Sequence, residues 1–375
     1  MAGIYIHIPF CKTRCTYCDF YSTTDSSMTS RYIQAVCKEL INRKDYLDNE
    51  PIETIYLGGG TPSQLSVAEL TLLFETIYAT YDTQQLKEVT LEANPDDLSK
   101  EYLQALQTLP INRLSIGVQT FDDNMLKKLN RRHSATQALQ AISMAQDLGF
   151  DNISLDLIYG LPSESMEKWI HDIQTALDLA VSHISAYHLI YEKGTVLEKQ
   201  LSKGIIHEVD EEFSLQSFTK LIEMLTENGF THYEISNFAK NDKISIHNSS
   251  YWRNSKYLGC GPSAHSYNQH TRDFNTPSLQ QYITNLENNQ QSLEVEYLDT
   301  DTRYNDYIIT SLRTMWGLSL ETLKKEFGDF YYNYALKAAE KHIKSDFLEL
   351  KNNKLKLTQK GIFLSDGIMS DLLHI

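Results

Sequence analysis

The alternation of strand-like and helix-like segments in the first half of the chain is the feature that most restricts its fold. Short apolar runs predict strands at residues 3–8, 53–57, 88–92, 113–118, 152–157 and 183–188. Amphipathic stretches between them predict helices at residues 29–43, 66–78, 99–106, 135–148 and 165–179. Strands that are separated by helices pair in parallel, so this pattern predicts a partial (β/α) barrel of the TIM type.

A doubly wound open sheet is the alternative arrangement of the same units. The dinucleotide fingerprint G-x-G-x-x-G is absent after the first strand, which favours the barrel. We expect residues 1–200 to form the barrel core and residues 201–298 to continue it. Residues 299–375 are expected to form a small α+β domain like a winged helix, with helices at 302–315, 320–327 and 334–346 and a hairpin at 348–358.

The charge and hydropathy of the chain exclude several classes of protein. The 375 residues include 34 Lys and Arg against 49 Asp and Glu, a formal net charge of -15. This charge disfavours nonspecific contact with nucleic acid or an anionic membrane, so we predict no nucleic-acid partner and at most peripheral membrane contact. No apolar run approaches the ~18 residues that span a bilayer, and no secretory signal is visible. We therefore predict a cytoplasmic location.

Three of the five cysteines lie close together, directly after the first predicted strand. Cys11, Cys15 and Cys18 have the spacing C-x3-C-x2-C, and an odd, low cysteine count argues against a disulfide scaffold. Thiolates this close can converge on a metal centre. Structural zinc needs a fourth ligand at short range, and the nearest histidine, His7, lies on the strand. Three cysteines would leave one iron of a [4Fe–4S] cluster with an open position, as in a working metal centre.

The cysteine motif, with Tyr17 before the last cysteine, is similar to the signature of the radical S-adenosylmethionine (SAM) superfamily. The resemblance implies that SAM binds the open iron through its amino and carboxylate groups. It also implies that an electron from the cluster, supplied by a reductant, cleaves SAM.

Several strands end in glycine or in polar residues, at the edge where a barrel builds its site. Residues 58–60 are three glycines, which let the backbone approach a ligand closely. Glu92, Gln119 and Asp156 end three further strands, and carboxylates and amides suit ribose hydroxyls. A strand-end cap or a salt bridge explains any one of these three, whereas a ligand site explains them together. Tyr5 and His7 share one face of the first strand and are expected to line the barrel interior.

The order of these motifs resembles the oxygen-independent coproporphyrinogen III oxidase group, over residues 3–275 and in the C-terminal domain. The motifs are Y-I-H-I-P-F-C from Tyr5, L-G-G-G-T-P from Leu57, E-A-N-P from Glu92, G-V-Q from Gly117 and D-L-I-Y-G-L-P from Asp156. The resemblance implies SAM contacts at Tyr5, Tyr17, Gly59, Gly60, Thr61, Glu92, Gln119, Arg131 and Asp156. Arg131 lies in a basic loop that is also interpretable as a solvated surface patch.

Two departures from the oxidases favour the shorter heme chaperones of the group. The oxidases have a further cysteine where this chain has Phe20, and they have an N-terminal arm before the first strand, which here begins at residue 3. The heme chaperones also carry an H-N-x-x-Y-W motif, present here as residues 247–252.

The H-N-x-x-Y-W motif offers the groups that heme needs. His247 is a candidate axial ligand, and Tyr251 and Trp252 are candidate flat surfaces for the macrocycle. A loop histidine beside two core aromatics is the other interpretation, and His232 and His265 are rival ligands.

Three functions follow from these patterns. The preferred hypothesis is a heme chaperone that carries a [4Fe–4S] cluster with SAM and transfers heme to an unidentified acceptor protein. The alternative is a coproporphyrinogen oxidase that converts propionates to vinyl groups, so whether the chain is an enzyme stays open. The third is a structural zinc protein whose wing contacts nucleic acid. A homodimer is possible in each case.

Overall fold

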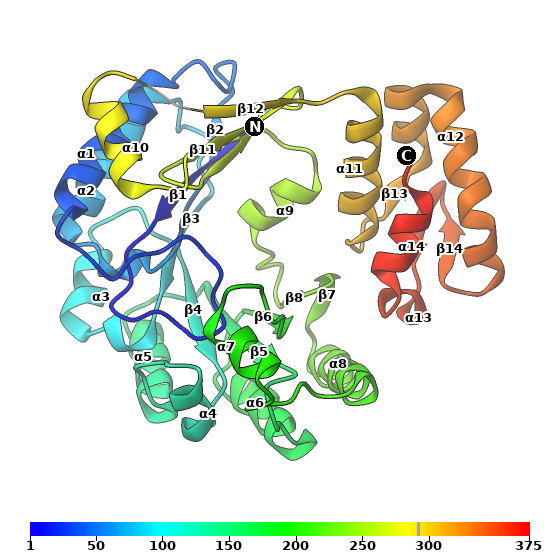
Figure 1. Ribbon diagram of the computed structural model, residues 1–375, viewed down its shortest axis with the longest axis horizontal. Coiled ribbons are helices and arrows are strands. Elements are labelled where there is room, and N and C mark those ends of the chain that lie inside the picture. Colours follow the sequence, from blue (N-terminus) through cyan, green and yellow to red (C-terminus); the bar gives the residue numbers. More distant parts are fainter. Residues whose placement is uncertain (291–292) are drawn as a thin grey trace.

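The fold is described from a computed structural model for residues 1–290 and 293–375. Figure 1 shows a large body of strands and helices followed by a smaller, mainly helical part that holds the C-terminus. No helix in these ranges is long and apolar enough to cross a membrane.

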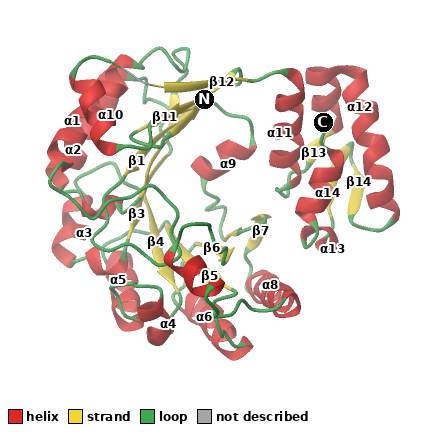
Figure 2. Cartoon of the chain, in the orientation of Figure 1, coloured by secondary structure: helices red, strands yellow, loops and turns green. Residues whose placement is uncertain are grey.

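The six predicted parallel strands are present and lie side by side in chain order. They are β1 (Ala2–Ile8), β2 (Ile52–Gly59), β3 (Glu88–Ala93), β4 (Arg113–Gln119), β5 (Ile153–Tyr159) and β6 (His183–His188). The predicted helices between them are α1 (Thr29–Asn42), α2 (Val67–Thr80), α3 (Lys100–Leu106), α5 (Ala135–Asp147) and α6 (Met166–Asp178). They lie along the outside of the strands (Figure 2). The prediction of a partial (β/α) barrel is confirmed.

Short elements that sequence periodicity did not predict complete this body. The helices are α4 (Asp123–Lys128), α7 (Val196–Ser202), α9 (Ile246–Trp252) and α10 (Leu279–Glu287), with short 3-10 helices η1 (Pro62–Gln64) and η2 (Pro95–Asp97). The strands are β7 (Thr231–Glu234), β8 (Asn237–Ala239), β9 (Tyr257–Cys260), β10 (His265–Tyr267), β11 (Thr271–Asn275) and β12 (Leu293–Tyr297). Most have too few residues to show a period. A longer helix, α8 (Glu211–Glu227), follows α7.

These added strands extend the barrel strands into one mixed sheet. Its order in the described residues is β12-β11-β10-β9-β1-β2-β3-β4-β5-β6-β8-β7. Strand β9 pairs in parallel with β1, and β8 pairs antiparallel with β6. Among residues 1–290 and 293–375 the two ends of the sheet do not pair with each other, so the barrel is open.

The barrel strands bury apolar side chains under the helices and turn polar side chains toward the interior. Ile4, Ile6 and Ile8 of β1 are fully buried in the main apolar core, and the other barrel strands repeat this period of two. The polar positions with the opposite parity are Thr54, Glu88, Thr90, Glu92, Arg113, Ser115, Ser154, Asp156, His183 and Ser185. The interior is therefore a polar space rather than an apolar core.

The C-terminal part has its own apolar core and a three-stranded sheet. Its elements are α11 (Thr300–Leu312), β13 (Leu318–Ser319), α12 (Leu320–Lys344), β14 (Leu348–Lys351), β15 (Lys354–Leu357), α13 (Gln359–Ile362) and α14 (Ser365–Leu372). The predicted hairpin is β14–β15. The two helices predicted at 320–327 and 334–346 are one element, broken only where Gly328 takes a φ of 83°.

The C-terminal part docks on the barrel through backbone and ionic contacts. Met315 N donates to Tyr233 O at 2.9 Å, and Ile235 N donates to Arg313 O at 3.2 Å. The Arg313 guanidinium also lies 4.9 Å from the ring of Trp252 in α9. Helix α9 therefore touches both parts of the molecule, as its position between the sheet and α11 in Figure 1 illustrates.

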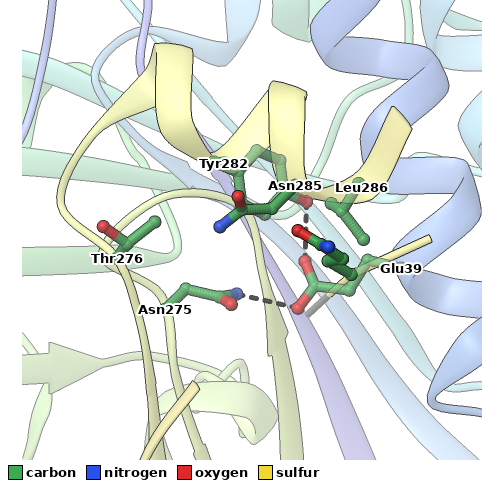
Figure 3. A pocket seen from close by; sticks show the side chains of 7 residues that line it. Glu39, Asn275, Thr276, Tyr282, Asn285 and Leu286 are labelled. Atoms are coloured by element: carbon green, nitrogen blue, oxygen red, sulfur yellow. Dashed lines mark hydrogen bonds between the residues drawn. The ribbon is translucent and has the colours of Figure 1, made fainter. Parts of the chain in front are cut away.

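A buried polar cluster ties α1 to the extension of the sheet. The Glu39 carboxylate accepts hydrogen bonds from Asn275 Nδ2 at 2.8 Å and Tyr282 Oη at 2.6 Å (Figure 3). Directly after α1, Arg43 Nη2 donates to Asp273 Oδ2 at 2.7 Å. The cavity beside Glu39 measures only about 10 Å³, so this cluster is structural and not a ligand site.

Replacing Asp273 with alanine should destabilise the protein, because the buried Arg43 guanidinium loses its hydrogen-bonded carboxylate and keeps only the longer ion pair with Glu39 at 3.6 Å. We expect a loss of about 3 kcal/mol in the free energy of unfolding, measured by urea denaturation. The control is Glu287→Ala, which removes the exposed ion pair with Arg31 and should cost less than about 1 kcal/mol. Equal losses in the two variants would contradict a structural role for the buried pair.

Candidate functional site

One large cavity of about 410 Å³ opens at the carboxyl ends of the barrel strands. Most of the residues predicted for the cluster and SAM line it, although they come from distant parts of the chain. They are Cys11, Cys15, Cys18, Tyr17, Gly59, Gly60, Thr61, Glu92, Gln119, Arg131 and Asp156. The barrel topology explains this convergence, because the carboxyl ends of parallel strands meet at one edge.

Backbone hydrogen bonds at Cys11 and Thr16 hold the cysteine loop in place. Cys11 N donates to Thr23 O at 2.9 Å, and Thr16 N donates to Leu129 O at 3.1 Å. Burial raises the pKa of the Cys11 thiol and raises that of Cys18 to about 11. The thiolate form that a metal centre needs therefore depends on positive charge supplied by the metal or by neighbouring groups.

Arg131 supplies such a charge beside the cysteine loop. Its Nη1 atom lies 3.5 Å from Cys15 Sγ, and its Nη2 atom donates to Asn94 Oδ1 at 2.7 Å and to the carbonyl oxygen of Gly117. The Thr61 hydroxyl donates to Cys11 Sγ at 3.3 Å. In the part of the chain that the structure describes, no three His, Cys, Asp or Glu side chains are grouped so as to hold a metal ion. The thiols instead face a shared cavity.

The glycines at the carboxyl end of β2 line the cavity with backbone, because a side chain there would collide with its neighbours. Gly59 has a φ of 106°, and a Cβ atom there would lie 2.7 Å from the ring of His7. A Cβ atom at Gly60 would lie 3.0 Å from Cys11 Sγ. The positive φ and the close approach both require glycine, so the backbone itself faces the cavity.

Two carboxylates line the cavity on the strands that follow β2, and Glu92 lies directly beside the glycines. Glu92 accepts hydrogen bonds from Tyr56 Oη at 2.7 Å and from Gly59 N at 3.1 Å. Asp156 accepts from Ser115 Oγ at 3.3 Å. Burial raises the pKa of Glu92 to about 7 and raises that of Asp156. Both groups suit ligand hydroxyl or ammonium donors in their ionised form.

Tyr5 is the one predicted SAM residue that does not line the cavity as the structure describes it. Its ring stacks on Tyr56 with centroids 6.1 Å apart, and its hydroxyl lies 3.1 Å from His7 Nδ1. Tyr5 therefore packs behind Tyr56, and Tyr56 lines the cavity. Gln119 lines the cavity with a φ of 75°, an unusual backbone state for a residue other than glycine.

Sequence reasoning missed several residues that line the cavity. They are Asn94, Ser115, Ser185, Tyr187, His188 and Ile190, among others. A count in steps of two along the inward faces of β4 and β6 would have found Ser115, Ser185 and Tyr187. Ile190 follows β6 in a loop, where no period exists to indicate its direction.

The structure does not present His247 as a free heme ligand. Its ring is fully buried, with Nδ1 2.8 Å from Thr54 Oγ1 and Nε2 2.8 Å from Tyr251 Oη. Burial lowers its pKa to about 3, so the ring is neutral. Trp252 lies against Arg313 rather than on an open surface. In this conformation α9 closes the floor of the barrel, and the role of this motif in heme binding stays a prediction.

The rival histidines differ in exposure. His232 is partly buried, and its Nε2 atom lies 3.1 Å from Ile235 O. His265 is exposed and packs against Phe274 away from the cysteine cavity.

Comparison with known proteins gives the family. A sequence model of the radical SAM superfamily matches residues 5–176, and one of the HemN C-terminal domain matches residues 298–364. The heme chaperone HemW of Bacillus subtilis (strain 168) is 35% identical, over 100% of this chain and 99% of that protein. HemW of Lactococcus lactis is 32% identical, over 98% and 96%. The chain belongs to the HemW family of radical SAM proteins.

A solved structure supports the fold assignment for this family member. Coproporphyrinogen III oxidase (HemN) from Escherichia coli superposes with a TM-score of 0.86 at 21% identity, covering 99% of this chain and 89% of that chain. The match includes both the barrel and the C-terminal domain.

Replacing His247 with alanine should lower stability, because Thr54 and Tyr251 lose a buried partner and a void forms. We expect a loss of about 2–4 kcal/mol in the free energy of unfolding by chemical denaturation. The control is His265→Ala, at an exposed position, with an expected change below about 1 kcal/mol. An unchanged stability of the His247 variant would show that α9 does not depend on this ring.

Proposed function

We propose that this protein binds heme and transfers it to an acceptor protein, and that it carries a [4Fe–4S] cluster and SAM in the cysteine-lined cavity. The observation that carries the proposal is the convergence of three thiols, a glycine wall and two carboxylates on one cavity. Sequence identity of 35% and 32% to two HemW proteins, over nearly the full length of this chain, supports the heme assignment.

The residues fit a cluster and SAM by their chemistry. Cys11, Cys15 and Cys18 would hold three irons, and the cluster would supply an electron and an open iron position for SAM. Gly59 and Gly60 would accommodate the methionyl part of SAM, because only glycine permits this approach. Arg131 would offset the negative charge of the thiolates.

We propose that heme binds at the mouth of the same cavity. Phe20, Tyr187 and Ile190 line the cavity, yet 62%, 44% and 64% of their surfaces are exposed. Large apolar side chains gathered at a cavity favour an apolar ligand, and a porphyrin is flat and apolar. His188 lines the same cavity and is a candidate axial ligand there, although its Nε2 atom lies 3.0 Å from Ser214 Oγ and would have to leave that partner.

The alternative function is oxidation of coproporphyrinogen. It shares the cavity but calls for the thiol that the oxidases have at the position of Phe20. An exposed aromatic side chain there favours binding of a macrocycle over that chemistry. The acceptor protein and the reductant remain proposed partners, and a cytoplasmic location and a homodimer stay predictions.

The mouth assignment predicts that Ile190→Asp weakens heme binding at least about tenfold, because it places a charge against the macrocycle. Heme affinity is measured by titration of the Soret absorbance with the anaerobically reconstituted full chain. The matched control is Ile205→Asp, because Ile205 is 66% exposed but does not line the cavity in the described structure.

The other outcomes of this titration are equally informative. Loss of heme affinity in His247→Ala with normal affinity in Ile190→Asp would place heme on α9 and overturn the mouth assignment. Turnover of coproporphyrinogen by the same reconstituted sample would overturn the chaperone proposal in favour of the oxidase.

A further inference from the structure

A single arginine lies buried in the barrel floor, beneath the cavity. Arg113 begins β4 and is 1% exposed. None of its three guanidinium nitrogens has a hydrogen-bond partner among the residues that the structure describes. Buried charged groups are normally paired, because the loss of hydration is costly. This charge therefore calls for a specific explanation.

The nearest carboxylate does not neutralise Arg113 by close contact. Arg113 Nε lies 4.0 Å from Glu88 Oε2, the limit of an ion pair. The Glu88 carboxylate already accepts hydrogen bonds from Ile246 N at 2.8 Å and His247 N at 2.9 Å. Much of the positive charge of Arg113 is therefore available to other carboxylates in the interior.

The strand register brings that charge beneath the two cavity carboxylates. Arg113 lies opposite Thr90, and the next inward residue of β4, Ser115, lies opposite Glu92. The Ser115 hydroxyl donates to Asp156 on the neighbouring strand. One inward step along a strand is about 7 Å, so the guanidinium lies one layer below both carboxylates.

The buried histidines and tyrosines around this layer are neutral at physiological pH. Burial, and then the charge of Arg113, lower the pKa of His183 and His247. Burial raises the pKa of the surrounding tyrosines, which are Tyr5, Tyr56 and Tyr233. Arg131 faces Asp156 from the cavity side. Arg113 is thus the positive charge that acts on the carboxylates from below.

We propose that Arg113 is a positioning residue of the cavity: its charge keeps Glu92 and Asp156 ionised despite their burial, so that they accept hydrogen bonds from SAM. The inference rests on the proposed SAM site and adds to it a residue that touches neither SAM nor the cluster.

The proposal has a definite pH signature. Burial raises the pKa of Glu92 to about 7, while Tyr56, Gly59 and Arg113 oppose that rise. The carboxylate accepts hydrogen bonds and the protonated acid accepts them less well, so SAM affinity should fall as pH drops through about 7. Removal of the Arg113 charge raises the pKa further, and the midpoint of this fall moves to higher pH.

The experiment is calorimetric titration of SAM into the anaerobically reconstituted full chain between pH 5.5 and 8.5. We expect the midpoint to move up by about one pH unit or more in Arg113→Gln and to stay near that of the unmodified protein in Arg113→Lys. Glu92→Gln should flatten the pH dependence, which identifies the titrating group.

A second variant keeps the inference testable if Arg113→Gln does not fold. Glu88→Gln leaves the guanidinium in place and removes the competing carboxylate, so the midpoint should move to lower pH. The same midpoint in all of these Arg113 and Glu88 variants would overturn the role of Arg113 while leaving the SAM site intact. Absence of SAM binding at every pH in the unmodified protein would overturn the proposed function itself.

Discussion

The period-two alternation of β1–β6 is the constraint on which the rest of the molecule depends. It buries isoleucine, leucine and valine beneath the helices and leaves the interior polar. The cavity can therefore collect thiols, carboxylates and a guanidinium at the carboxyl ends of the strands. The same alternation also buries charged side chains below the cavity, where Arg113 lies 4.0 Å from Glu88. Fold and site chemistry thus have one physical origin.

Helix α9 completes this interior and joins it to the C-terminal domain. His247 fills the floor between Thr54 and Tyr251, and Trp252 meets Arg313 across the domain boundary. In this conformation the H-N-x-x-Y-W motif therefore contacts both the barrel and the C-terminal domain. The heme surface that we propose is instead the apolar rim at the cavity mouth, formed by Phe20, Tyr187 and Ile190.

The sequence predicted the elements that are long or strongly periodic and the residues next to recognisable motifs. The barrel strands, the cysteine loop and the polar strand ends fall in this class. It missed β7 to β12, because strands this short carry no period. It could not foresee the two buried partners of His247, because a histidine with such partners and a histidine that binds heme look the same in a sequence. Arg113 escaped notice because its role depends on strand register, which aligns it with Glu92 only in three dimensions.

The central claim is that the thiols, the carboxylates and the apolar mouth act as one site. Linkage tests it most directly: heme affinity of the reconstituted full chain is measured by Soret titration with and without saturating SAM. Ligands that share a cavity wall influence one another, and we predict a change in heme affinity of at least about fivefold. Identical heme affinity with SAM, without SAM and in a Cys15→Ala variant that lacks the cluster would contradict the account.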